Sequence, residues 1–538
     1  MLPGWASVTV NSAKSNLPSH DLADFNPNLA KSLFWSYDLA ALKQVTVDFS
    51  AEFRSPDVGK FVGRDDVCAV LKRALKSGDP ELIAVYGRRR VGKTFLIREF
   101  FGDQLRLEIT GALNASTQQQ LKNFAKALAA AAAGGKKTWD VPANWSDAFQ
   151  QLEQYLTSLG INRKQVLFID ELPWFASRGS GFLSALDHWW NTRGTRRKNL
   201  IVVVCGSAAS WMIHNVVHNR GGLHNRLTRR IRLEPFTLAE TLQFLRSRRV
   251  ELGLRHIVEL YMAMGGIPHY LKEVDGGLSA AQNIDQLCFS PTGLLRDEFQ
   301  RLYSSLFDHS ERHIRVVRAM SQLRRGLTRN EVLDAAEVAT GGTVTALLDE
   351  LVEAGFVARV SPFGKGKKDT LYRLADEYSL FYLNWIESHR GVPKNTWLAK
   401  SKTPSWRAWS GYAFESVCMK HLPQIRHALG IAGIETNESA WTYRPTTRKT
   451  NGAQIDLLID RADGCINVCE MKFSEGAFVI DKAYAAELNR KLSTFREMTG
   501  TRKTLFLTLV TAGGLKDNQY RRELVTHAVP LEKLFVEV

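Results

Sequence analysis

One short stretch constrains the fold of this chain more than any other. From Glu81 the sequence reads ELIAVYGRRRVGKTFLIREFF. LIAVY is an apolar run typical of a parallel strand buried on both faces, and TFLIREFF has the spacing of a helix. Between them, Gly87 and Gly92-Lys93-Thr94 complete the pattern G-x-x-x-x-G-K-[ST] in a strand-loop-helix context. The stretch therefore predicts an α/β fold with a parallel sheet.

A loop of this pattern binds nucleotide phosphates. Its glycines let backbone N–H groups surround the phosphates at a helix N-terminus, Lys93 reaches the β- and γ-phosphates, and the Thr94 hydroxyl ligates magnesium. We therefore expect ATP and Mg²⁺ as cofactors. The residues expected to bind the nucleotide are Gly87, Arg88, Arg89, Arg90, Val91, Gly92, Lys93 and Thr94.

Two further apolar runs end in polar residues. QVLFIDELPWF carries Asp170 and Glu171, and LIVVVCGSAASWM carries Ser207. Open parallel sheets place ligands at the carboxyl ends of their strands. We expect Asp170 to hold the metal ion, Glu171 to polarise the attacking water and Ser207 to sense the γ-phosphate. A simple turn at Ser207 is the alternative.

Arginines after the third run are candidates for stabilising charge on the phosphates. Arg226, in HNRLTRRIRLEPF, is a candidate arginine finger that acts in cis or in trans, and Arg229 and Arg230 compete with it. The sequence leaves open whether the chain works as a monomer or as a homo-oligomer. The oligomeric state decides whether Arg226 acts in cis or in trans.

The charge and length of the chain bear on its partners and its location. The chain has 538 residues, a net charge of +16 and six cysteines without CxxC pairs. The length favours two to four domains, and the cysteines fit a reducing compartment. Membrane-spanning runs and a signal peptide are absent from the sequence, so we expect a soluble, cytoplasmic protein. The charge favours a polyanionic partner without proving nucleic-acid binding, and each basic cluster could equally be a solvated face. The partner we expect is nucleic acid, above all DNA.

The middle of the chain has the order of a winged helix. Helix, turn and helix are followed by two strands, and LTRNEVLDAAE opens with the capping residue Thr328. ARVSPFGKGKKDTLYRLAD reads as a hairpin with lysines at its tip. A basic wing would contact the DNA backbone. A winged helix used only as an internal lid or protein contact is an equal alternative.

A hairpin near the C-terminus places charges in an apolar setting. In GAQIDLLIDRADGCINVCEMKF, a turn centred on Asp463 would set Asp456 directly across from Glu470, with Lys472 on the same face as Glu470. The two carboxylates repel each other, and a divalent cation would offset that repulsion. Lys472 could then activate water and stabilise charge on a phosphate.

Neighbouring segments would complete this cleft. The helix SWRAWSGYAFESVCMKHL places Glu415 on one side with Tyr412 and Met419, so a carboxylate lies on an apolar face. The helix DKAYAAELNRKLSTF could turn Tyr484, Lys491 or both toward the cleft, and KTLFLTLVT would continue the sheet. A buried ion network without metal, or a fold that only binds DNA, is the alternative.

The ATP-site motifs together resemble the archaeal-type P-loop ATPases, relatives of the AAA+ and STAND nucleotide switches. The resemblance rests on FVGRDDVCAVLKRAL, the phosphate loop, DELPWF, CGSAASWM, IRLEPFTLAE and GGIPHYL, and it runs roughly from Phe61 to the C-terminus. In that family GGIPHYL belongs to a helical lid, and a C-terminal DUF234-like, PD-(D/E)XK nuclease-like domain often follows.

The C-terminal hairpin resembles the core of the PD-(D/E)XK nuclease superfamily. This resemblance implies that Asp456 and Glu470 bind metal, that Lys472 is the catalytic lysine and that Glu415 is the helical acid. Ile455 stands where the name-giving proline would be.

The expected function follows from the two sites. It is an ATP-hydrolysing protein coupled to a Mg²⁺-dependent DNA phosphodiesterase, and the alternative is a nucleotide-dependent regulatory switch that binds DNA or protein without cutting. The expected domains are an unassigned extension (1–55), a P-loop ATPase core (56–238), a helical lid (239–305), a winged helix (306–380), a linker (381–405) and an α/β/α PD-(D/E)XK-like domain (406–538).

Overall fold

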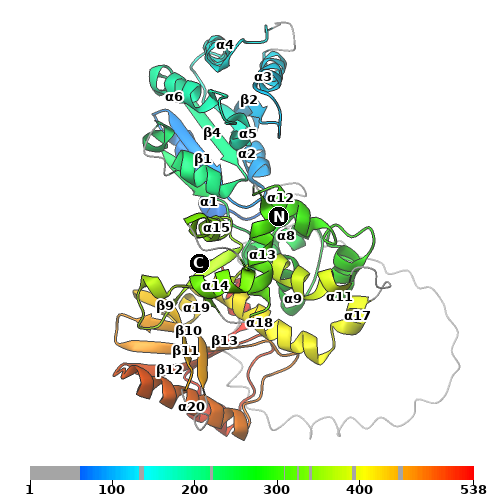
Figure 1. Cartoon of the computed structure of the whole chain (residues 1–538), viewed down its shortest axis with the longest axis vertical. Coiled ribbons are helices and arrows are strands. Elements are labelled where there is room, and N and C mark those ends of the chain that lie inside the picture. Colours follow the sequence, from blue (N-terminus) through cyan, green and yellow to red (C-terminus); the bar gives the residue numbers. More distant parts are fainter. Residues whose placement is uncertain are drawn as a thin grey trace, which may run out of the picture. The chain divides into compact units, whose positions relative to one another are not determined.

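The structure is a computed structural model of the chain. It describes residues 61–538 apart from 133–138, 218–221, 308, 324–325, 338–341, 390–395 and 446–451. The N-terminal extension that the sequence left unassigned lies outside the described residues. The chain divides into two units, Met1–Asp57 and Val58–Val538, and all elements below belong to the second (Figure 1).

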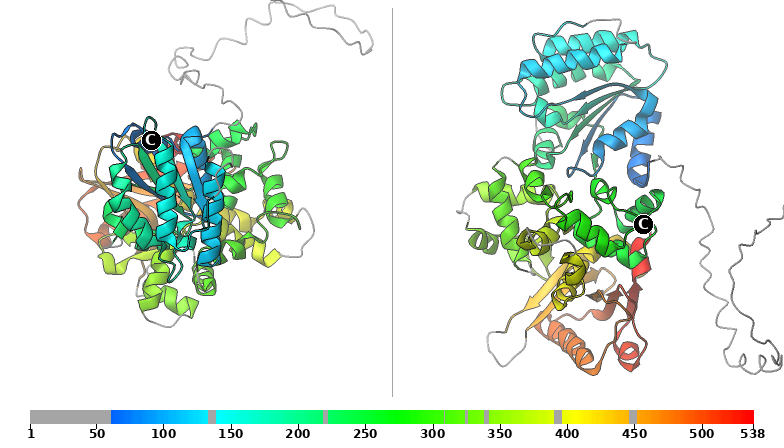
Figure 2. Two further views of the ribbon diagram at one scale, coloured as in Figure 1. Left: turned by 90° about the horizontal axis from the view of Figure 1, so that it is seen from above. Right: turned by 90° about the vertical axis from the view of Figure 1, so that its right-hand side faces the viewer.

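The first sheet is entirely parallel, and helices cover both of its faces (Figure 2). Its strand order is β2-β3-β4-β1-β5, which places β4 between β1 and β3. The strands are β1 (Glu81–Tyr86), β2 (Leu105–Thr110), β3 (Gln165–Asp170), β4 (Leu200–Gly206) and β5 (Arg229–Arg232). β1, β3 and β4 are almost fully buried, as their apolar runs predict. The predicted α/β fold with a parallel sheet is therefore confirmed.

Two buried clusters hold the helices on this sheet. On one face, α1 (Asp65–Lys76) and α2 (Lys93–Phe101) pack against alternate residues of β1, such as Ile83 and Val85. On the other face, α3 (Thr117–Ala131), α4 (Trp145–Ser158) and α6 (Phe182–Thr192) pack against Leu82 and Ala84. Because successive side chains of a strand point to opposite faces, a single apolar strand supplies both clusters.

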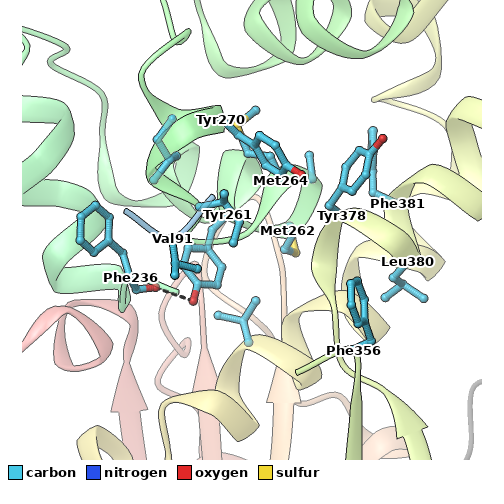
Figure 3. Packing of buried hydrophobic residues seen from close by; sticks show 14 of the residues in the cluster. Val91, Phe236, Tyr261, Met262, Met264, Tyr270, Phe356, Tyr378, Leu380 and Phe381 are labelled. Carbon is cyan, nitrogen blue, oxygen red and sulfur yellow. Dashed lines mark hydrogen bonds between the residues drawn. The ribbon is translucent and has the colours of Figure 1, made fainter. Parts of the chain in front are cut away.

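A group of helices follows the first sheet. It comprises α8 (Leu238–Ser247), α9 (Leu254–Met264), α10 (Pro268–Leu271), α11 (Ala280–Ile284) and α12 (Glu298–Ser304). A Cβ on Gly266 would lie 2.0 Å from the carbonyl oxygen of Phe236, so this close approach requires glycine. The Tyr261 hydroxyl also donates to that oxygen at 2.8 Å (Figure 3). Val91 of the phosphate loop and Phe356 belong to the same buried cluster.

The residues described between 310 and 374 form helices and a small antiparallel sheet. The elements are α13 (Ser310–Ser321), β6 (Leu327–Thr328), α14 (Arg329–Ala336), α15 (Gly342–Glu353), β7 (Val357–Pro362) and β8 (Leu371–Leu374). Thr328 caps α14 in a reciprocal pair with Glu331, so the predicted cap is confirmed. β8 pairs with both β6 and β7.

The small sheet does not end at its hairpin. β7 pairs in parallel with β9 (Thr436–Tyr443) through Ser361 opposite Ser439 and Pro362 opposite Ala440. The result is one eight-stranded sheet with the order β13-β12-β11-β10-β9-β7-β8-β6. Sequence reasoning placed these strands in two separate domains, and nothing local in β7 signals the shared sheet.

The C-terminal part of this sheet lies between two helices. The strands are β10 (Ala453–Arg461), β11 (Cys465–Lys472), β12 (Thr504–Thr511) and β13 (His527–Pro530). α18 (Pro404–Lys420) packs on the face that carries Leu457 and Met471, and α20 (Lys482–Thr499) packs on the face that carries Leu458 and Val468. β12 extends the sheet in parallel with β11, as predicted.

The segment predicted as a linker, residues 381–405, is part of the core where the structure describes it, and that prediction is wrong. It contains α17 (Thr396–Lys400), and Trp397 is fully buried against Trp385 and Trp406. The backbone N–H of Trp397 donates to the Asp285 carboxylate at 2.9 Å. Burying these large aromatic side chains is strongly favourable, so the segment packs in the core and does not serve as a solvated linker.

Two observations concern the environment of the chain. All six cysteines are free thiols. Of the helices within the described ranges, none combines the length and the apolar character that crossing a bilayer requires.

Candidate nucleotide site and C-terminal cleft

The phosphate loop joins β1 to α2 and depends on two glycines. Gly87 has φ +139°, and a Cβ there would lie 2.3 Å from the carbonyl oxygen of Leu233. Gly92, directly before α2, has φ +91°. Both values lie in a region that residues with side chains rarely adopt, so the loop shape follows from the glycine spacing.

Lys93 lies inside this loop. Its ammonium group donates to the carbonyl oxygens of Gly87 at 3.0 Å and Arg88 at 2.9 Å, and only 6% of the residue is exposed. Burial lowers the pKa of Lys93. An anion bound in the loop would favour the charged form, so the arrangement suits phosphate.

Asp170 and Thr94 meet at the edge where the parallel strands end. The Thr94 hydroxyl donates to an Asp170 carboxylate oxygen at 2.7 Å, and Asp170 is 5% exposed. A hydroxyl and a carboxylate are donors that magnesium accepts alongside waters and phosphate oxygens. No group of three or more His, Cys, Asp or Glu suited to metal occurs in the described part of the chain, so these two residues would need phosphate to complete a site.

Glu171 is held in place by Ser207. The Ser207 hydroxyl lies 2.7 and 2.8 Å from the two carboxylate oxygens, and its backbone N–H donates to the second oxygen at 3.2 Å. Glu171 has φ 48°, a left-handed conformation that is unusual for this residue type and turns the chain sharply after β3. Ser207 therefore orients Glu171, a role that the sequence did not suggest for it.

Two cavities adjoin the loop. The first, of about 640 Å³, is lined by Arg89, Arg90, Lys93, Thr94, Glu171 and Ser207 among others. The second, of about 450 Å³, adjoins Val91 and Gly92 and is mainly apolar, with Phe61, Phe95 and Phe236 in its lining. Sequence reasoning missed the second cavity, although Phe61 opens the FVGR motif that marks this region of the chain.

Two arginines of the loop point into the protein. Arg88 is buried and forms an ion pair with the buried Asp376, which caps the helix that follows β8. Arg90 pairs with buried Glu298 at 2.9 Å, and the Tyr270 hydroxyl donates to the same carboxylate at 3.0 Å. The Arg88 side chain therefore does not line the first cavity. The prediction that Arg88 binds the nucleotide now concerns only its backbone.

The candidate arginine fingers lie away from the cavities. Arg226 is exposed at the end of a short 3₁₀ helix (Gly222–Arg226), and Arg229 forms an ion pair with Glu81 at 2.8 Å. Neither they nor Arg230 line either cavity. Within one chain they are therefore not placed to reach the phosphates, and the choice among them stays a prediction.

One family model matches this region of the chain. Residues 61–274 match an ATPase domain found predominantly in Archaea. This ATPase domain includes the phosphate loop, Asp170, Glu171 and Ser207, and the match supports ATP binding and an ATPase function.

The chain is also similar to individual proteins. An uncharacterised protein of Methanocaldococcus jannaschii is 22% identical over 405 residues, which cover 74% of this chain and 84% of that protein. The Walker-type ATPase of Pyrococcus abyssi has a TM-score of 0.45 at 16% identity, over 62% of this chain and 99% of that chain. The ORC2 protein of Aeropyrum pernix has a TM-score of 0.39 at 16% identity, over 65% and 98%.

In the C-terminal hairpin, the register follows the prediction and the alternation does not. Leu457 pairs with Cys469 and Leu458 with Val468, which centres the turn on Asp463, and the pairing with β11 covers Leu457 to Asp460 without reaching Asp456. Against β9, however, β10 has a bulge between Ile455 and Leu458, and both of these residues face α20. Strict alternation along β10 is therefore wrong at Asp456, because a bulge inserts one extra residue.

Glu470 is held by three donors. Lys491 contacts one carboxylate oxygen at 2.7 Å, and the Tyr484 hydroxyl donates to the other at 3.0 Å. The Lys472 ammonium group lies 3.4 Å from that second oxygen, so Lys472 and Glu470 share a face as predicted. Both Tyr484 and Lys491 of α20 therefore turn toward Glu470.

Glu415 lies in the cleft, and its carboxyl group has a raised pKa. Burial raises the pKa of Glu415 to about 7, the negative charge of Asp456 adds to this, and Arg373 of β8 opposes it. Arg373 donates to the Glu415 carboxylate at 3.3 Å, and Gln454 donates to Asp456 at 2.7 Å. Sequence reasoning missed Arg373, because it lies in the strand assigned to another domain.

These side chains line a cleft of about 480 Å³ between α18 and β10–β11. Glu415, Asp456 and Lys472 all contribute to it, together with Arg407, Tyr412 and Gln454. Glu470 is not in the lining, because α20 covers its carboxylate. Of the four predicted residues, Glu415, Asp456 and Lys472 therefore line the cleft. The carboxylate of the fourth, Glu470, lies 3.4 Å from the Lys472 ammonium group.

Proposed function

We propose that this protein hydrolyses ATP at the phosphate-loop edge and couples nucleotide binding to a Mg²⁺-dependent DNA phosphodiesterase in its C-terminal cleft. The observation that carries the first half is the convergence of Lys93, Thr94 and Glu171 on one cavity. The DNA partner, the winged helix and a cytoplasmic location belong to the same proposal.

In the ATPase half, each residue has a distinct task. The loop N–H groups and Lys93 bind the phosphates, while Thr94 and Asp170 are the residues that would hold magnesium, which neutralises phosphate charge when bound. Glu171 accepts a hydrogen bond from a water and directs it toward the γ-phosphate, and Ser207 keeps the carboxylate in position. The apolar cavity beside Val91 suits a base ring such as adenine.

In the C-terminal half, Asp456 lines the cleft, and Glu470 would join it in holding a divalent ion only by exchanging its contacts with Lys491 and Tyr484 for the metal. Lys472 lies next to both the cleft and Glu470, so it can orient a water and stabilise negative charge on a phosphate. Glu415, whose pKa lies near 7, can exchange a proton with that water at neutral pH.

A reciprocal pair of variants tests the proposal. ATP hydrolysis and cleavage of plasmid and linear DNA are measured with magnesium for Lys93→Ala, Lys472→Ala and the control Lys122→Ala, an exposed lysine on α3. We expect Lys93→Ala to abolish nucleotide binding and Lys472→Ala to lower cleavage about 100-fold or more while ATP hydrolysis continues. Absence of cleavage by the wild type under every condition would contradict the phosphodiesterase half.

A second candidate function is a nucleotide-dependent switch whose C-terminal domain recognises DNA or protein without cutting. The contacts of Glu470 favour it, because Lys491 and Tyr484 already satisfy both carboxylate oxygens without a metal. Calorimetric titration with Mn²⁺ separates the two. Binding that Asp456→Ala and Glu470→Ala both abolish supports the phosphodiesterase, and absence of binding supports the switch.

A further inference from the structure

A second cavity adjoins the C-terminal cleft. It has a volume of about 330 Å³ and lies between the β6–β8 hairpin region and the C-terminal strands, with Thr328, Thr442 and Arg444 in its lining. Gln454 and Asp456 line both this cavity and the cleft of about 480 Å³. The two hollows therefore meet at Asp456.

The junction exists because two parts of the chain share one sheet. Pairing of β7 with β9 brings the β6–β8 strands against the C-terminal strands, and the bulge in β10 lies beside Asp456. Thr328 and Arg373 approach from one side of this seam, and Thr442 and Gln454 approach from the other. Neither part of the chain could form the second cavity alone.

Each hollow carries an arginine that is available for a ligand. Arg407 of α18 lines the cleft, and Arg444 at the end of β9 lines the second cavity. Both are exposed, and neither has an ion-pair partner among the residues that the structure describes. Arg373, by contrast, is buried and pairs with Glu415. Glu331 also lines the second cavity, but its carboxylate is engaged in capping at Thr328.

We propose that a single DNA strand runs through both hollows, with Arg444 and Arg407 each binding a backbone phosphate on opposite sides of Asp456. This inference rests on the proposed function, because it names the form of the substrate and how the same cleft holds it. Both cavities have volumes within the range of about 300–1,000 Å³ that is typical of small-ligand sites, so each has room for one nucleotide of a strand. Unpaired guanidinium groups suit the bidentate geometry of phosphate.

Binding is measured without cleavage. The full chain is titrated into a fluorescein-labelled thymidine oligonucleotide, and separately into a duplex, in EDTA, and anisotropy is followed at several salt concentrations. We expect Arg444→Ala and Arg407→Ala each to weaken single-strand binding about three- to tenfold and to lower the slope of log K against log salt by about 0.7. Arg502→Ala, an exposed arginine before β12 at the far end of the sheet, is the matched control and should change neither quantity.

Charge-retaining variants distinguish contact from damage to the fold. Arg444→Lys and Arg407→Lys should restore most of the salt slope, because lysine also neutralises a phosphate. Single-strand binding that both alanine variants leave at the wild-type level, or tighter binding of the duplex that depends on neither arginine, would overturn the inference. If the wild type never cleaves DNA but the alanine variants lose strand binding, the proposed strand path stands and the phosphodiesterase fails. If the protein cleaves DNA and neither substitution changes the cleavage, the phosphodiesterase stands and the strand path fails.

Discussion

The phosphate-loop edge and the C-terminal cleft are both lined by acids and a lysine, but they are built differently. At the loop, Lys93 donates to carbonyl oxygens and contacts no carboxylate among the residues that the structure describes, so its ammonium group can bind an incoming anion. In the cleft, Glu470 already has Lys491 and Tyr484 as donors, and Lys472 lies beside it. The first site is arranged to receive phosphate, whereas in the proposed phosphodiesterase site a metal ion would have to displace an internal contact of Glu470.

The two regions also differ in how far apart their parts lie in the sequence. The loop is a continuous run whose shape follows from Gly87 and Gly92. The cleft draws Glu415, Asp456 and Lys472 from one helix and two strands, and Arg373 from a strand of the preceding part of the chain. The shape of the loop is therefore set locally, although the Arg88–Asp376 ion pair joins it to a distant segment, whereas the cleft depends throughout on packing between distant segments.

The largest expected effect tests whether the loop edge is an ATPase site. Glu171→Gln should lower the rate of ATP hydrolysis about 1,000-fold and leave nucleotide affinity near the wild-type value, because the amide no longer accepts a proton from water. Glu99→Gln, an exposed carboxylate on the rim of the same cavity, is the control. Steady-state hydrolysis and fluorescent-nucleotide binding measure the two quantities. Wild-type turnover in Glu171→Gln would remove this residue from the chemistry.

The next effect tests how firmly the loop is anchored to the rest of the chain. Asp376→Ala leaves the buried Arg88 guanidinium without its partner and removes a helix cap, so the free energy of unfolding should fall by about 3–5 kcal/mol. Urea denaturation followed by circular dichroism measures it, with the exposed Asp369→Ala as the control. A loss below about 1 kcal/mol would mean that the ion pair contributes little beyond its own desolvation.

A pH dependence tests the contact between α8 and the residue that follows α18. This residue, His421, accepts a hydrogen bond from the backbone N–H of Leu238 in α8 at 2.9 Å, and burial lowers the pKa of His421 to about 4. The unfolded chain binds this proton at a pKa of about 6.5, so the free energy of unfolding should fall by about 3 kcal/mol as the pH falls from 7 to 4.

The matching variant isolates that histidine. His421→Gln should lose this part of the pH dependence, since glutamine keeps an acceptor but does not titrate. Denaturation at both pH values gives the comparison. An unchanged pH dependence in the variant would show that another group is responsible.

The smallest effect sharpens the contrast at Glu470. If the cleft binds metal, Lys491→Met should tighten Mn²⁺ binding about tenfold, because it removes a positive charge beside the carboxylate. Lys482→Met, an exposed residue of the same helix, is the control. Calorimetric titration measures the affinities. Weaker binding in Lys491→Met would show that Lys491 holds Glu470 in its binding position and does not compete with the ion.

The sequence by itself determined the phosphate loop, the parallel sheet and the register of the C-terminal hairpin. These features depend on residues close together in the chain, where glycine conformations, apolar runs and a turn at Asp463 act directly on the backbone. Only the tertiary structure decided the bulge at Asp456, the pairing of β7 with β9, the partners of Arg88 and Arg373, and the burial of Trp397. Each of these depends on partners distant in sequence, whose contacts leave no periodic signal in the residues that make them.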